Sequence, residues 1–316
     1  MQVNRKIFLS IVTLLTIIVF IVAYLFYVMP INDHRIFGVT YMTMNNPFYE
    51  IINNELKKNI EKNGDRLITL DPQLDIDKQN KQIYSFIEQK VDGIFINPID
   101  AKKIEPALKA AKKAHIPIIT VDAPVTNKDL VNCTVVSDNY NAGVQCAKYM
   151  MSKLKSANIV LLKHTTALSA KQRIEGFLDT IDAHSEYKII NQGECKGQLE
   201  KAMPVMQRIL KETPEVDVVM ALNDPSALGA LAALESMGYE DVMVYGVDGT
   251  PDIKSLIEES PMVAGTVAQS PISIGKIAAK NMYDLLSGKE IGSNIVIPVE
   301  IITKENIAQF NKTGWQ

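Results

Sequence analysis

The stretch VYGVDGTPD, residues Val244–Asp252, has the pattern of a buried strand that leads into a helix. Its β-branched, apolar first half predicts a strand with the Asp248 carboxylate at its end. Gly249 permits a turn, and Thr250-Pro251 is typical of a helix N-cap followed by proline at the first helical position. Because ligands of parallel α/β sheets bind at the carboxyl ends of strands, this stretch predicts both the fold class and the place of a site.

The same pattern recurs where three other predicted strands end. Short polar residues and a proline follow each of these strands: Asn46-Pro47, Asn223-Asp224-Pro225 and Gln269-Ser270-Pro271. Asn, Asp and Gln side chains supply hydrogen-bond donors and acceptors. Four such strand ends in one chain predict a pocket that hydrogen-bonds a small polar ligand.

Strand and helix patterns alternate along most of the chain, which predicts an α/β fold with parallel sheets. The expected strands are residues 36–41, 66–70, 91–96, 116–121, 133–136, 159–162, 187–191, 216–221, 242–247, 263–268 and one last extended segment, 295–302. The expected helices are residues 47–63, 76–89, 101–114, 140–154, 170–183, 199–211, 225–237 with Asp224 as its N-cap, one from Pro251, and 272–286. A second series starts near residue 159, so the 316 residues are expected to form two similarly built lobes.

The N-terminal region contains an apolar run from Ile7 to Met29 without a charged residue or glycine. As a helix it is about 34 Å long, enough to cross a bilayer core of about 30 Å. Arg5 and Lys6 precede it, so the positive-inside rule places the rest of the chain outside the cytoplasm. A cleaved signal peptide is the alternative, but its apolar region is normally shorter and is followed by small residues. We expect residues 1–33 to form a cytoplasmic stub, an uncleaved transmembrane anchor and a linker.

Charge and cysteine content exclude several classes of protein. The chain has 33 Lys and Arg against 36 Asp and Glu, which argues against a nucleic-acid-binding surface. Its three cysteines, Cys133, Cys146 and Cys195, are an odd number without metal-site spacing. They cannot form a complete disulfide framework, so we expect buried or unpaired thiols.

Motifs for catalysis and cofactor binding are absent from the sequence. It contains no G-x-G-x-x-G, no P-loop and no G-x-S-x-G, and its four histidines are scattered. We therefore expect no cofactor, no metal and no enzymatic activity. One minority alternative is a glycoside hydrolase in which Asp122 and Asp248 form the carboxylate pair. A sugar-binding protein also uses carboxylates, because one ionised carboxylate accepts two hydroxyl hydrogens at once.

Two adjacent aromatic residues, Phe48 and Tyr49, follow the first strand end. Both could be core residues, and Asn46 before them could serve only as a helix cap. One of two adjacent aromatic residues on a helix points away from the core, however, and here that direction is the predicted pocket. Aromatic faces stack against the apolar faces of sugar rings while polar neighbours bind the hydroxyls. For Gln269 the roles of turn residue and ligand contact are equally open.

Six segments strongly resemble the ribose-binding protein group of the type I periplasmic sugar-binding proteins, which feed sugar ABC transporters. They are MNNPFY (44–49), IPIITVD (116–122), VSDN (136–139), ALND (221–224), GVDGTPD (246–252) and VAQ (267–269). The resemblance extends over essentially the whole chain from Arg35. It implies two Rossmann-like lobes with parallel sheets, joined by three hinge crossovers and closing on a sugar. The implied N-terminal lobe is residues 34–137 with 270–298, and the C-terminal lobe is 138–269 with 299–316.

The resemblance also implies which side chains bind the sugar. The implied hydroxyl-binding residues are Asn46, Asp122, Asn223, Asp248 and Gln269, with Phe48 and Tyr49 as stacking or wall residues. Three positions depart from the ribose pattern: Ala123 replaces an arginine, Val247 replaces an aromatic residue, and Lys171 takes the place of an arginine expected before Glu175-Gly176-Phe177. Loss of a planar guanidinium is not conservative, so another pentose, a hexose or a polyol is as open as ribose.

We therefore expect a membrane-anchored, extracytoplasmic monosaccharide-binding protein at the cell surface or in the periplasm. It would deliver its sugar to an ABC transporter permease or signal to a membrane partner. The alternative is a sensor subunit of a histidine kinase system without a transport role. An anchor favours sensing, since it confines both partners to one plane and raises their effective concentration. Sugar-responsive repressors of the same fold group carry a DNA-binding motif where this chain has its apolar run, so we exclude that class.

Overall fold

A computed structural model describes residues 2–28 and 34–316 of the chain. The chain divides into two compact units, Met1–Arg35 and Ile36–Gln316, which are described separately. The first unit contains helix α1 (Gln2–Val28). Its segment Ile7–Tyr24 is exposed and has a mean hydropathy of 2.8. By length and composition it could cross a membrane, and a signal sequence meets the same criterion. The predicted end of the apolar run and most of the predicted linker fall on residues 29–33, outside the described residues.

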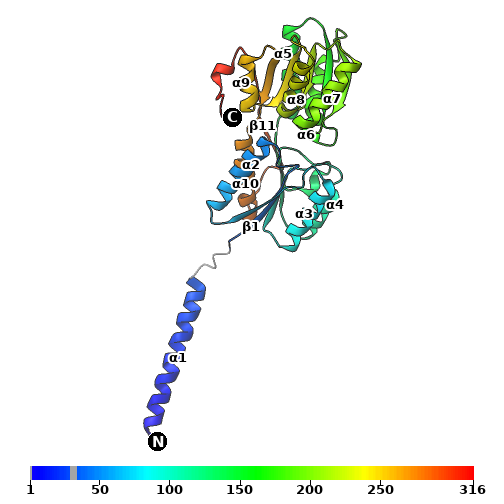
Figure 1. Cartoon of the computed structure of the whole chain (residues 1–316). Helices are drawn as coiled ribbons and strands as arrows, with labels where there is room; N and C mark the ends of the chain where they lie inside the picture. Colours follow the sequence, from blue (N-terminus) through cyan, green and yellow to red (C-terminus); the bar gives the residue numbers. More distant parts are fainter. Residues whose placement is uncertain (1, 29–33) are drawn as a thin grey trace. The chain divides into compact units, whose positions relative to one another are not determined.

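The second unit contains two lobes, each built on one sheet (Figure 1). In the described residues the sheet of the first lobe has six strands in the order β11-β5-β4-β3-β1-β2, all paired in parallel. Its strands are β1 (Ile36–Thr40), β2 (Arg66–Leu70), β3 (Gly93–Ile96), β4 (Ile118–Val121), β5 (Cys133–Ser137) and β11 (Asn294–Ile297). Its helices are α2 (Pro47–Glu61), α3 (Ile76–Glu88), α4 (Glu105–Lys113), α10 (Pro271–Leu286) and the short η1 (Lys128–Leu130).

Helices cover both faces of this sheet, so its strands are apolar on both sides. Neighbouring residues of β3 are buried on opposite faces of the sheet, because successive side chains of a strand point in opposite directions. Phe95 belongs to the core cluster beneath α2 and α10, whereas Ile94 and Ile96 belong to the cluster beneath α3 and α4. The continuous apolar strand runs of the sequence are explained by this two-sided burial.

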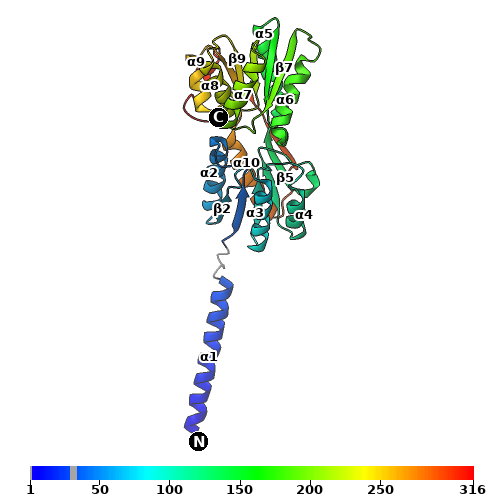
Figure 2. The same cartoon turned by 45° about the vertical axis from the view of Figure 1, so that its right-hand side comes forward.

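The second lobe has the same construction (Figure 2). Within the described residues its sheet has six strands in the order β12-β10-β9-β8-β6-β7, parallel except for β12, which pairs antiparallel with β10. Its strands are β6 (Ala157–Lys163), β7 (Tyr187–Glu194), β8 (Val218–Ala221), β9 (Met243–Asp248), β10 (Val263–Ala268) and β12 (Glu300–Ile302). Its helices are α5 (Asn139–Lys153), α6 (Leu168–Ile181), α7 (Leu199–Glu212), α8 (Asp224–Ser236), α9 (Pro251–Glu259) and the short η2 (Ile307–Gln309).

The chain crosses between the lobes three times, after β5, after β10 and between β11 and β12. The predicted fold of two α/β lobes joined by three crossovers is confirmed. The predicted extended segment 295–302 contains two short strands, β11 and β12, which belong to different sheets. Pro298 lies between them and has no N–H to continue a strand ladder.

The strand ends that the sequence singled out begin helices in the expected way. Asn46 caps α2 by accepting a hydrogen bond from the Phe48 amide, and Thr250 caps α9 through the Ile253 amide. The prediction of Asp224 as the cap of α8 is wrong. Asn223 is the cap, accepting from the Ser226 amide at 3.1 Å, and Asp224 is the first helical residue.

Candidate functional site

The polar strand ends of both lobes line one cavity between them. Six of the predicted site residues contribute to its wall: Asn46, Phe48, Tyr49, Asp122, Asn223 and Asp248. Gln269 lies directly behind Asp248, since its Nε2 donates to Asp248 Oδ1 at 2.7 Å. Parallel sheets explain this convergence, because their strands deliver side chains to the same carboxyl edge.

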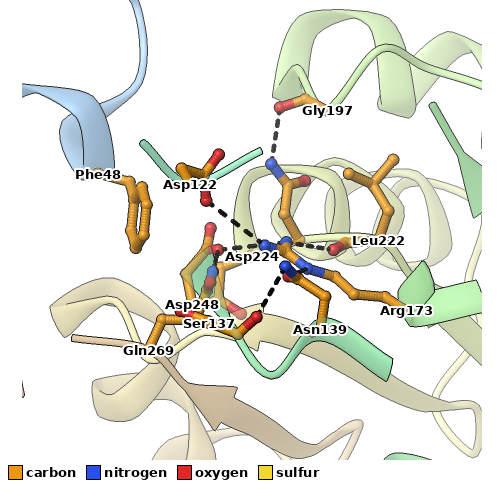
Figure 3. A network of polar contacts seen from close by, with 12 residues as sticks. Phe48, Asp122, Ser137, Asn139, Arg173, Gly197, Leu222, Asp224, Asp248 and Gln269 are labelled. Atoms are coloured by element: carbon orange, nitrogen blue, oxygen red, sulfur yellow. Dashed lines mark hydrogen bonds and ion pairs between the residues drawn. The ribbon is translucent and has the colours of Figure 1, made fainter. Parts of the chain in front are cut away.

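Arg173 on α6 occupies the centre of this arrangement and was missed by the sequence reasoning (Figure 3). Its guanidinium lies 3.9 Å from Asp122 Oδ1 of the first lobe and 3.6 Å from Asp248 Oδ1 of the second. Its Nε donates to Asn139 Oδ1 at 2.8 Å, and its Nη1 donates to the Leu222 carbonyl at 2.9 Å. These contacts fix the orientation of one buried cation between carboxylates of the two lobes.

Lys171, a predicted site residue, does not line this cavity, and in this respect the structure differs from the prediction. Its exposed side chain lies 3.5 Å from Glu175, one turn further along α6. Two residues correspond to about 200° around a helix, so Lys171 and Arg173 lie on opposite faces. Arg173 is on the buried face with Ala170 and Phe177, at the spacing i+3 and i+4. That helical spacing was the signal by which the sequence could have identified it.

Asp122 is held by a residue for which the sequence analysis predicted no role. Asn97 follows β3 and donates from Nδ2 to Asp122 Oδ2 at 3.1 Å. The Asn97 amide oxygen accepts from the Met42 amide, so its side-chain orientation is fixed as well. The motif Asn97-Pro98 matches the pattern of the other strand ends, and this was the signal that could have placed it in the site.

Both carboxylate residues have an unusual backbone conformation. Asp122 has a φ of 65° and Asp248 a φ of 147°, in the region that normally requires glycine. Such a conformation costs on the order of 1–3 kcal/mol and persists where the surrounding structure imposes it. Both residues line the same cavity, where each carboxylate faces Arg173.

Three acceptor atoms, two at this cavity and one directly behind it, take no hydrogen bond within the described part of the chain. They are Asp122 Oδ1, Asp248 Oδ2 and Gln269 Oε1, all buried. Buried polar atoms in proteins are normally hydrogen-bonded, so unpaired acceptors on both lobes indicate a bound molecule that supplies donors. The Tyr49 hydroxyl, which donates to Met42 Sδ at 3.6 Å, lies in the same wall.

Burial controls the titration of the carboxylates. It raises the pKa of Asp122, while the Arg173 guanidinium acts in the opposite direction. Burial raises the pKa of Asp248 further, again opposed by Arg173, and the Asp224 and Asp122 carboxylates add to the increase. Desolvation disfavours the charged form of an acid, whereas hydrogen bonds donated to that form favour it. Hydroxyl donors therefore stabilise the ionised carboxylates that this site otherwise disfavours.

The first lobe supplies an aromatic wall. Phe48 and Tyr49 both line the cavity and both belong to the main core cluster. Each is therefore a core residue and part of the cavity wall at the same time. Their rings meet edge to face with centroids 5.9 Å apart, and Tyr49 also stacks on Tyr41 at 5.8 Å. Burial raises the pKa of Tyr49 well above its usual value, so its hydroxyl remains protonated and can donate.

The described residues contain no group of three or more His, Cys, Asp or Glu side chains placed to hold a metal ion. Cys133, Cys146 and Cys195 are free and buried, as predicted. Burial raises the pKa of the Cys133 thiol to about 11, which keeps it protonated at neutral pH.

Comparison with known proteins gives consistent results over most of the chain. The family model described as periplasmic binding protein domain matches residues 37–290. The ribose import binding protein RbsB of Bacillus subtilis (strain 168) is 33% identical over 270 residues, which cover 85% of this chain and 87% of that protein. The galactofuranose-binding protein YtfQ of Escherichia coli (strain K12) is 32% identical over 232 residues, covering 67% and 73%. A crystal structure of an ABC transporter solute binding protein from Mycobacterium smegmatis with bound glycerol has a TM-score of 0.83 at 27% identity and covers 88% of this chain and 96% of that one.

Proposed function

The chain belongs to the type I periplasmic sugar-binding proteins, and on this premise we propose that it binds one neutral monosaccharide or polyol between its lobes. The observation that carries the proposal is the pair of unpaired buried acceptors at one cavity, Asp122 Oδ1 of the first lobe and Asp248 Oδ2 of the second, with Gln269 Oε1 directly behind Asp248. Sugar hydroxyls supply the donors that these atoms need. Asn46 and Asn223 add amide contacts, and Phe48 and Tyr49 form the wall for the ring.

The charge of the cavity supports a neutral ligand. Two carboxylates, Asp122 and Asp248, face one buried guanidinium, Arg173, while Lys196 lies in the wall with an exposed side chain. Arg173 already contacts both carboxylates, so a phosphate or carboxylate on the ligand would find no unpaired buried cation in this wall, and burying an unpaired charge is strongly unfavourable. The ligands named for the similar proteins, ribose, galactofuranose and glycerol, are neutral polyhydroxy compounds and support the same conclusion.

Binding would be coupled to closure of the lobes, taken as residues 34–137 with 270–298 and residues 138–269 with 299–316. The sugar gains contacts from both lobes only when they are close together, so it favours the closed state by that difference in affinity. The three crossovers are the natural hinges, since hinge bending is absorbed by a few residues at the ends of elements.

A thermal-shift panel of residues 34–316 tests this proposal. We expect at least one of D-ribose, L-arabinose, D-galactose, xylitol and myo-inositol to raise the melting temperature, because a ligand at 100 times its Kd adds about 2.7 kcal/mol of stability. Ribose 5-phosphate and galacturonic acid serve as matched charged controls and should give no shift. A shift with the charged compounds alone would contradict the proposal. The glycosidase alternative is tested in parallel with p-nitrophenyl glycosides, from which we expect no release of nitrophenol.

We also propose that α1 is retained as a membrane anchor and places residues 34–316 outside the cytoplasm. The closed form would deliver sugar to an ABC transporter permease. A retained anchor would favour the second candidate function, docking on a membrane sensor such as a histidine kinase, because both partners then share one membrane. Neighbouring genes for a permease or for a kinase would distinguish the two.

Fractionation of cells that express the full chain tests the anchor. We expect the intact protein, still detected by an antibody to residues 2–6, in the membrane fraction after a high-salt wash. The control, residues 34–316 without α1, should be soluble and bind the same panel sugar. Recovery of the full-length product as a soluble protein that lacks the N-terminal epitope would show cleavage and contradict the anchor.

A further inference from the structure

The C-terminal segment Asn311–Gln316, here called the strap, is fastened to the second lobe. Lys254 of α9 is fully buried, and its Nζ donates to the carbonyl oxygens of Asn311 and Gly314. It also donates to Gln316 Oε1 at 3.3 Å. At the outer side of α9, Lys312 forms an ion pair with Glu258 at 2.6 Å. A buried lysine whose three protons are directed at one segment holds that segment in a defined position.

The strap lies against the part of the second lobe that carries the site. Gln316 Oε1 is 3.3 Å from the position that a Cβ at Gly249 would occupy, and Gly249 directly follows Asp248. Figures 1 and 2 both place the C-terminus beside α9, at the junction with the first lobe. The strap therefore lies close to the strand end that carries Asp248.

Trp315 of the strap reaches the first lobe. Its ring meets the Phe48 ring edge to face, with centroids 5.6 Å apart and an interplanar angle of 65°. Phe48 is at the start of α2 in the first lobe and lines the cavity. The contact thus joins a residue fixed to the second lobe with the aromatic wall supplied by the first.

From this juxtaposition we infer that Trp315 is a positioning residue for sugar binding, which holds the Phe48 ring in place when the lobes are closed. The inference rests on the proposed function, because Phe48 is taken as a wall of a sugar site. Edge-to-face aromatic pairs stabilise the state in which they form. Since the strap is attached to α9, opening of the lobes separates Trp315 from Phe48 and removes that stabilisation. Trp315 thereby favours the closed, sugar-binding state without touching the sugar.

Replacing Trp315 with leucine in residues 34–316 tests the inference. We expect the dissociation constant for whichever of D-ribose, L-arabinose, D-galactose, xylitol and myo-inositol binds to rise roughly tenfold, which corresponds to the strength of one such aromatic pair with its buried area. Trp315→Phe should restore most of the affinity, and Tyr84→Leu, at an exposed aromatic residue of α3, is the matched control that should leave it unchanged. Isothermal titration calorimetry gives the constants, and the melting temperature of the sugar-free variants should stay within about 2 °C of the wild type.

Tryptophan fluorescence gives an independent readout, because Trp315 is the only tryptophan in the sequence. We expect saturating sugar to shift its emission to shorter wavelength and to reduce acrylamide quenching, as closure places the ring against Phe48. Two results would overturn this inference while leaving the proposed function intact. One is wild-type affinity in Trp315→Leu, and the other is an emission spectrum that does not change when a sugar is added whose binding calorimetry detects. Failure of every panel sugar to bind the wild-type protein would overturn both.

Discussion

Replacing Arg173 with alanine is expected to abolish sugar binding and to lower the melting temperature of residues 34–316 on the order of 10 °C. The guanidinium is buried between Asp122 and Asp248 and holds Asn139 and Leu222 by hydrogen bonds. Removing one partner of a buried ion pair costs roughly 3–5 kcal/mol, since the remaining charges are left unpaired. For a domain of this size each kcal/mol corresponds to roughly 2–4 °C. Thermal unfolding and calorimetric titration measure the two effects.

Lys171→Ala on the same helix is the matched control for Arg173→Ala. Lys171 is exposed and its ion pair with Glu175 is a surface pair, so both affinity and stability should remain within error of the wild type. Arg173→Lys should lie between the two, because it retains the charge but loses the planar fork that contacts several acceptors at once. The stability loss of Arg173→Ala should shrink at acid pH, where the two carboxylates take up protons. If Lys171→Ala lost binding while Arg173→Ala retained it, the centre assigned to the site would be wrong.

Replacing Asp248 with asparagine is expected to weaken sugar binding by roughly 30- to 1,000-fold while leaving thermal stability equal to or above that of the wild type. Hydrogen bonds to a charged group contribute about 1.5–3 kcal/mol each, and the carboxylate can accept from two hydroxyls. The amide still accepts from Gln269 Nε2, so the local structure has the same contact. Stability does not fall, because Arg173 keeps Asp122 as a carboxylate partner and the ionised Asp248 carboxylate is itself disfavoured by burial.

The pH dependence separates this explanation from a simple loss of contact. Folding raises the pKa of Asp248. The contribution of this residue to the free energy of unfolding is therefore fully present below the ordinary carboxylate pKa of about 4, and it is lost as the pH rises through the folded-state pKa. Sugar hydroxyls favour the ionised form, so binding releases protons and affinity should increase with pH in that range. Asp248→Asn should flatten the increase, whereas Asp252→Asn, an exposed position in the same stretch, should keep it. An affinity that falls with rising pH would contradict the assignment.

The sequence predicted the two lobes because local signals coincide with the fold. Asn46-Pro47 and Thr250-Pro251 mark helix starts through side-chain capping, which depends on neighbouring residues alone. The errors lie where long-range packing decides. Asn223 rather than Asp224 caps α8, since the Asp224 carboxylate instead accepts from Thr266 Oγ1 at 2.6 Å and the Thr250 amide at 2.8 Å.

For the site, residue types were easier to predict than their orientation. The carboxylates and amides at strand ends could be predicted from the sequence. Lys171 was preferred over Arg173, however, because the prediction relied on its position before Glu175-Gly176-Phe177 and not on which face of helix α6 is buried. The sequence also gave no indication that Trp315 lies against Phe48, which depends on how the strap folds back onto α9. Such contacts between segments far apart in the chain require the structure.

A crystal structure of residues 34–316 grown with the panel compound that gives the largest thermal shift tests the central claim most directly. The account predicts one sugar molecule within hydrogen-bond distance of Asp122 of the first lobe and of Asp248 and Asn223 of the second, with its ring against Phe48. A sugar bound to one lobe only, or bound away from Arg173 while Asp122 and Asp248 remain without it, would contradict the account.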